Sequence, residues 1–188
     1  MPALRFANDG GPLIAFDARL ADQWYGNRSD DQTDPIPPGS DYERACIARG
    51  PADLLKIADG AGVVIGAHEG ISTAWWQSLR SGGLCLVGCV YGDQASDAQL
   101  NEILNDESVA GDWQRLGTLN LQSGRLLLLH AASEGRTVNV DPVAEYACIE
   151  DAVSGSLIRG ICEVSCRVLS CQGGLYNLVQ WQPRARAA

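Results

Sequence analysis

Residues 54–66, LLKIADGAGVVIG, form two apolar runs on either side of Asp59-Gly60. An Asp-Gly pair between two apolar runs is a strong local signal for a β-hairpin. The segment therefore predicts two antiparallel strands joined by a tight turn. Strand-like runs continue directly after it, in ISTAWW (71–76) and GLCLVGCVYG (83–92).

The C-terminal part of the chain, residues 113–182, is also rich in strand patterns. Its clearest signal is a second hairpin, with ICEVSCRVL and LYNLVQW on either side of residues 171–174. Further strand-like runs are WQRLGTLNL and RLLLLHAA, which flank a turn at 122–124, and TVNV (137–140). PVAEYACIED (142–151) fits either a helix or a strand.

Three short helices are expected between the strands. One covers residues 17–24, with Asp17 as its cap and Gly26 as its end, and another covers 96–106, with Ser96 as its cap. The third begins at SDYERAC (40–46), where Ser40 and Glu43 form the S-x-x-E capping box and Gly50-Pro51 closes the helix. The predicted fold class is α+β: mostly antiparallel β-sheet with a few short helices, in one domain spanning 1–188.

Composition restricts the function. The 188 residues carry a formal net charge of −9 with a pI near 4.6, so the basic footprint that nucleic-acid binding needs is missing. No run of 18 apolar residues and no secretory signal occur, so we expect a cytoplasmic protein without a membrane span. An acidic surface suits a basic partner.

The seven cysteines are an odd number in a chain without an export signal, so free thiols are expected. Cys85 and Cys89 are four residues apart, as are Cys162 and Cys166. This even spacing places each pair on one face of a strand. Two histidines and no C-x₂-C pair argue against a zinc site, and no nucleotide-binding glycine fingerprint occurs. We expect no metal and no cofactor.

No complete catalytic constellation is visible. His68-Glu69 could serve as a base and its orienting acid in a small cytoplasmic hydrolase, although such a pair also fits a solvated loop. His130, at the end of the run RLLLLHAA, is expected to be a hydrogen-bonded strand-end residue. A structural interaction module is a further alternative.

Tryptophan and acidic residues stand out as candidate contacts. Trp75 and Trp76 are adjacent, so in a strand they point to opposite faces; we expect one in the core and the other exposed or covering another element. An acidic loop precedes the helix at Ser40, and a second acidic segment, 93–112, contains no Lys or Arg. The acidic candidates are Asp30, Asp31, Asp34, Asp41, Glu43, Asp93, Asp97, Glu102, Asp106 and Glu107.

Several motifs in residues 9–93 resemble those of the bacterial immunity protein 21 family. These are the G-G-P-L opening, the W-x-G motif, the D-Y-[DE]-R-A-C segment and a later S/T-T-x-W. The matching residues are Gly11, Pro12, Leu13, Trp24, Gly26, Asp41, Tyr42, Arg44, Cys46, Thr73 and Trp75.

The resemblance implies a protein that catalyses nothing and that binds and blocks a cognate polymorphic toxin in the producing cell. Acid-rich inhibitors suit basic toxins, since complementary charge speeds capture. We expect Tyr42 to be packed, Arg44 to be paired with an acid and Cys46 to be buried, which are structural roles.

Overall fold

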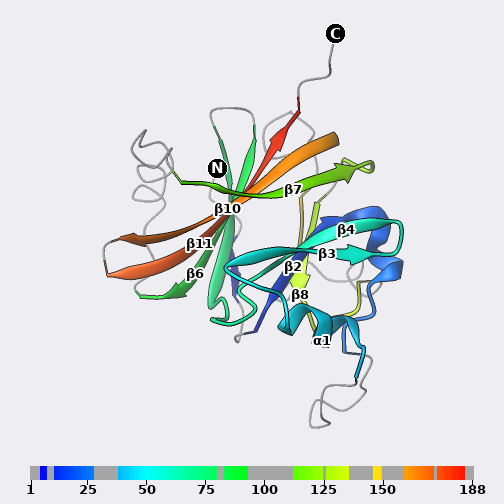
Figure 1. The fold of residues 1–188 in the computed structure, drawn as a ribbon, viewed down its shortest axis with the longest axis horizontal. Helices are drawn as coiled ribbons and strands as arrows, with labels where there is room; N and C mark the ends of the chain where they lie inside the picture. Colours follow the sequence, from blue (N-terminus) through cyan, green and yellow to red (C-terminus); the bar gives the residue numbers. More distant parts are fainter. Residues whose placement is uncertain are drawn as a thin grey trace.

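The computed structural model describes residues 5–7, 11–27, 38–79, 83–92, 112–124, 126–135, 146–149, 159–171 and 173–184 (Figure 1). In this part of the chain, the strands form two antiparallel sheets. The six-stranded sheet has the order β1-β5-β6-β11-β10-β7, and the five-stranded sheet has the order β3-β4-β2-β8-β9. The prediction of a mostly antiparallel sheet is therefore confirmed.

Most strand bounds follow the predicted runs closely, but no strand was predicted for β1. The six-stranded sheet comprises β1 (Arg5–Ala7), β5 (Thr73–Ser78), β6 (Leu84–Tyr91), β7 (Gln114–Leu121), β10 (Gly160–Cys171) and β11 (Gly174–Pro183). The five-stranded sheet comprises β2 (Leu13–Asp17), β3 (Ala52–Ile57), β4 (Gly60–Ile65), β8 (Leu126–His130) and β9 (Tyr146–Ile149).

Both predicted hairpins are confirmed. β3 pairs with β4 and β10 pairs with β11. The turn at 122–124 is also present, but β7 and β8 belong to different sheets, so it carries the chain from one layer to the other. The ambiguous segment 142–151 contains the strand β9.

The described helices are short. η1 (Ala18–Gln23) is a 3₁₀ helix whose cap is Asp17, as predicted. α1 (Asp41–Cys46) begins after Ser40 and is followed by its C-cap, Ile47. The predicted helix at 96–106 and the strand at 137–140 lie outside the described residues. No helix in the described part of the chain is long and apolar enough to cross a membrane.

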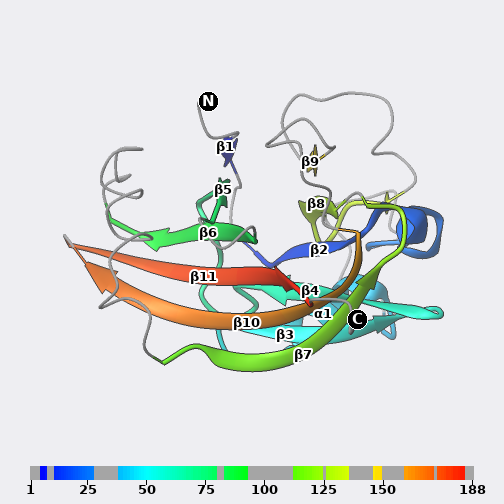
Figure 2. The ribbon, with the colours of Figure 1, turned by 90° about the horizontal axis from the view of Figure 1, so that it is seen from above.

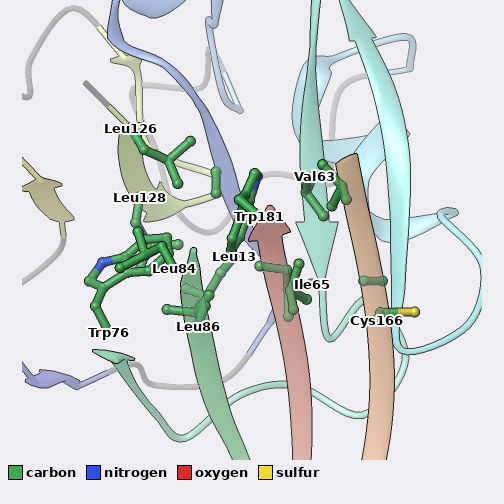
Figure 3. Packing of buried hydrophobic residues seen from close by; sticks show 14 of the residues in the cluster. Leu13, Val63, Ile65, Trp76, Leu84, Leu86, Leu126, Leu128, Cys166 and Trp181 are labelled. Atoms are coloured by element: carbon green, nitrogen blue, oxygen red, sulfur yellow. The ribbon is translucent and has the colours of Figure 1, made fainter. Parts of the chain in front are cut away.

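The main core lies between the two sheets. Figure 3 shows Leu13 and Ile65 of the five-stranded sheet beside Leu86 and Trp181 of the six-stranded sheet, and all four are buried. A second cluster includes Ile14 of β2 and residues of η1 and α1, so the two short helices cover the outer face of the five-stranded sheet. Alternation along β2 explains why it serves both clusters.

The outer face of the six-stranded sheet carries a third apolar cluster. It contains Trp75, Cys85, Val87, Cys89, Tyr176 and Leu178. Cys85 and Cys89 thus share one face, while Cys162 and Cys166 share the face toward the main core, as predicted from their spacing. All four thiols are free. Burial raises the pKa of Cys85 to about 12 and that of Cys162 to about 11, so both remain protonated at neutral pH.

Candidate functional site

The start of α1 is held by side-chain caps. The Glu43 N–H donates to Ser40 Oγ at 3.0 Å, which is the predicted half of the capping box. The other half differs, because the Glu43 carboxylate accepts from the Gly39 N–H instead of the Ser40 N–H. Gly39 has φ +75°, a left-handed conformation that bends the chain so that this earlier N–H faces the carboxylate. Glu43, a predicted toxin contact, is therefore engaged in capping.

Asp41 and Arg44 connect α1 to two neighbouring segments. Arg44 Nη1 donates to Asp41 Oδ1 at 2.8 Å, and Asp41 Oδ2 accepts from the Tyr25 N–H at 2.9 Å. Arg44 Nη2 also donates to the carbonyl oxygen of Lys56, on β3. The predicted pairing of Arg44 with an acid is confirmed. Only 16% of the Asp41 side chain is exposed. Asp41, which the sequence suggested as a toxin contact, therefore has a structural role.

The edge strand β3 has a second side-chain partner nearby. Asp53 Oδ1 accepts from the Leu54 N–H at 2.8 Å, and Asp53 Oδ2 accepts from the Arg49 N–H at 3.2 Å. β3 is the edge strand of its sheet in the described part of the chain, so one side of its backbone has no neighbouring strand. On β3, the Leu54 N–H bonds to the Asp53 side chain and the Lys56 carbonyl bonds to the Arg44 side chain.

Tyr42, Cys46 and His130 come together beside Gly11. The Tyr42 and His130 rings lie 5.9 Å apart, and a Cβ on Gly11 would lie only 2.9 Å from His130 Nε2. Tyr42 is packed against the outer cluster of the five-stranded sheet, as expected. Cys46 is only partly buried, contrary to expectation, because it occupies the last turn of a helix whose C-cap, Ile47, is exposed. Burial raises the pKa of both Tyr42 and Cys46.

Three further motif residues, Pro12, Trp24 and Gly26, lie against residues 131–132, directly after His130. Trp24 is fully buried, and its Nε1–H donates to the Ala131 carbonyl at 3.2 Å. Gly26 has φ +57°, and a Cβ there would lie 2.2 Å from the Ala132 carbonyl oxygen. The Ala131 N–H donates to the Pro12 carbonyl at 2.9 Å.

Residues 130–132 are thus the shared partner of motifs that lie far earlier in the sequence, between positions 11 and 42. Inside this segment, His130 Nδ1 accepts from the Ala132 N–H at 3.2 Å, which confirms the predicted strand-end role of His130. The sequence motifs do not predict that residues 130–132 are their partner, because these contacts form only when β8 pairs with β2.

Of the two alternatives for the second tryptophan, exposed or covering another element, the structure contradicts exposure. Trp75 and Trp76 do point to opposite faces, but both are buried, with 1% and 5% exposed. The reason is that the six-stranded sheet carries apolar clusters on both faces, so neither indole is available as a surface anchor. Thr73, on the same strand, is also buried, opposite Cys89.

His68 and Glu69 are both exposed in the turn between β4 and β5. The other acidic candidates lie outside the described residues: Asp30, Asp31, Asp34, Asp93, Asp97, Glu102, Asp106 and Glu107. Within the described ranges, no group of three or more His, Cys, Asp or Glu side chains could hold a metal ion.

Charge is unevenly divided along the chain. The described residues contain ten acids and nine Arg or Lys, which leaves −1. The other residues contain thirteen acids and five Arg, which leaves −8 of the total of −9. The described part of the chain, which holds the motifs, is therefore almost neutral.

The model of one protein family, Immunity protein 21, matches residues 6–168. The similarity extends well beyond residues 9–93 and includes β7, β8 and most of β10. No match was found among curated proteins or among solved structures. Since the family model covers most of the chain, this protein belongs to the immunity protein 21 family.

Proposed function

We propose that this protein binds a cognate bacterial toxin and neutralises it without catalysing a reaction. The observation that carries the proposal is the family match over residues 6–168, because the family consists of immunity proteins. Protection of the producing cell would take place in its cytoplasm, where the toxin must be blocked before export. We take the chain to act as one domain, in keeping with a main core that includes residues of both sheets.

The arrangement of the motif residues supports a binding role. Trp24 and Gly26 lie against residues 131–132, while Asp41 and Arg44 fasten α1 to its surroundings. A shared frame of this kind leaves loops and exposed strand faces free to differ according to the partner. The hydrolase alternative rests on His68 and Glu69 alone, and both are exposed on a turn.

We also propose that the toxin is basic overall. The acid-rich segments that lie outside the described residues carry −8 of the net charge of −9. Opposite net charge would steer the two proteins together and raise the association rate.

Co-expression with the toxin-like product of the neighbouring reading frame tests the proposed function. Cells should survive when both proteins are made, and the two should co-elute in size-exclusion chromatography. A toxin from an unrelated system is the control, and it should remain lethal. A His68→Ala variant should protect as well as the wild type. Loss of protection in this variant at unchanged solubility would favour the hydrolase, and failure of soluble wild-type protein to protect would refute toxin neutralisation.

A further inference from the structure

A β-bulge in β7 turns an arginine toward the outer face of the six-stranded sheet. Leu119 and Leu121 belong to the main core, and a Cβ on Gly117 would lie 2.7 Å from Leu54 Cδ1 of the facing sheet. Simple alternation would place Arg115 on that inner side too. The pairing register instead shifts between these two positions of β7. Gly117 is opposite Val164, but Arg115 is opposite the next residue of β10, Ser165.

The shift makes Leu116 the extra residue of the bulge. Leu116 packs against the main core, while Arg115 Nε lies 3.4 Å from Glu163 Oε1 on the outer face. Gly117 adopts φ +153° at this point, a value that residues with side chains rarely adopt. Bulges that re-aim a side chain in this way are frequent beside functional sites.

The register identifies what surrounds Arg115. Along β10, Cys162 and Val164 face the core, so Ile161 and Glu163 face outward. The Arg184 N–H donates to the Ile161 carbonyl at 2.9 Å, which places Arg184 opposite Ile161. Figure 2 shows β7, β10 and β11 as neighbouring strands in this region.

Four residues form an exposed group that we name the arginine face: Arg115, Ile161, Glu163 and Arg184. Their exposed fractions range from 42% to 58%. Arg184 Nη2 lies 3.2 Å from Glu163 Oε2, so the Glu163 carboxylate sits between two guanidinium groups. Two positive charges against one negative charge make this face locally basic on an acidic chain.

The chemistry of the arginine face suits a carboxylate. Each guanidinium has five N–H donors, more than the Glu163 carboxylate can occupy, and the planar fork matches a carboxylate in a bidentate pair. Arginine is enriched at protein interfaces, and the buried centre of an interface is more apolar than the rest of the surface. A phosphate would also fit the guanidinium groups, but the net charge of −9 opposes a polyanion, and Ile161 would have no role in binding it.

We propose that the arginine face is a contact surface for a carboxylate-bearing segment of the toxin, with Ile161 as its apolar member. This inference rests on the proposed function and specifies one surface through which it would operate. It is compatible with a toxin that is basic overall, because the contact requires only a local acidic segment.

The test is a binding measurement by isothermal titration calorimetry, with the purified toxin domain encoded beside the gene. Arg115→Glu/Arg184→Glu should weaken the complex by about tenfold or more, and Ile161→Asp by a similar factor. The matched control is Arg49→Glu, at an exposed arginine between α1 and β3, which should change the dissociation constant by less than about twofold.

A second variant separates binding from folding. Arg115→Gln/Arg184→Gln keeps hydrogen-bond donors beside Glu163 but removes both charges. It should retain the wild-type melting temperature within about 4 °C and still bind more weakly, with a loss that shrinks at high salt.

The possible outcomes distinguish the two proposals. If wild-type protein forms the complex and both double variants bind with the wild-type dissociation constant, the arginine face is not a contact. A short DNA duplex that bound the wild type more tightly than the toxin, and lost binding in the double variants, would also overturn it. Absence of any wild-type complex would refute the proposed function together with this inference.

Discussion

Replacing Arg44 with alanine would test whether the D-Y-E-R-A-C segment is structural. The change removes the pair with Asp41, which is worth about 0.5–1 kcal/mol because Arg44 is 37% exposed. It also removes a charged donor from the Lys56 carbonyl, at about 1–1.5 kcal/mol. The expected loss in the free energy of unfolding is therefore about 2 kcal/mol, or a melting temperature lower by about 4–8 °C.

Tryptophan fluorescence during urea unfolding can measure this loss, since Trp24 lies in the cluster that α1 covers. Asp41→Asn and the double variant would complete a cycle whose coupling energy isolates the ion pair. Arg49→Ala is the control, because among the described residues Arg49 contributes only its backbone N–H to a nearby bond. Unchanged stability combined with lost toxin protection would refute the structural reading and make Arg44 a contact residue.

Three further predictions concern the cap, a buried thiol and the acidic loop. Ser40→Ala should cost about 0.5–2 kcal/mol without changing toxin affinity, and equal stability with lost protection would contradict the capping role. Burial raises the pKa of Cys85 from 9 to about 12, so the unfolded chain loses this proton at a lower pH than the folded chain. The free energy of unfolding, measured by urea titration, should therefore decrease from about pH 9 towards 12, and this decrease should be smaller in Cys85→Ala. An equal decrease in both proteins would contradict the raised pKa. Replacing Asp30, Asp31 and Asp34 with Asn should slow toxin association in stopped-flow experiments and weaken its salt dependence. If neither this change nor a matching triple change in 93–112 alters the association rate, capture through these segments is wrong.

Local signals predicted the strands well. The signals at Asp59-Gly60 and at 173–174 correctly marked two hairpins. In the first, the two-residue loop is Ala58-Asp59, with φ +47° at Ala58, and Gly60 is already the first residue of β4. The caps at Asp17 and Ser40 were equally readable, because a cap depends on a few consecutive residues. For the same reason, the spacing of Cys85 and Cys89 was enough to place both on one face.

Contacts between distant segments were not predictable from these signals. Alternation showed that Trp75 and Trp76 diverge, but it contains no information on whether the second face of the sheet is also covered. The gathering of Gly11, Trp24 and Gly26 around residues 130–132 depends on the pairing of β2 with β8, which no local pattern specifies. The outward turn of Arg115 depends on a bulge, which a period-two reading of β7 misses.

The side-chain bonds along β3 have a consequence for how the protein behaves at high concentration. A free edge strand is a template on which a second chain can add a strand, and this is a common route to aggregation. On β3, the Lys56 carbonyl is already occupied by Arg44 and the Leu54 N–H by Asp53. An incoming strand would have to displace both charged groups, so the segment that fastens α1 also discourages edge-to-edge association of newly made copies.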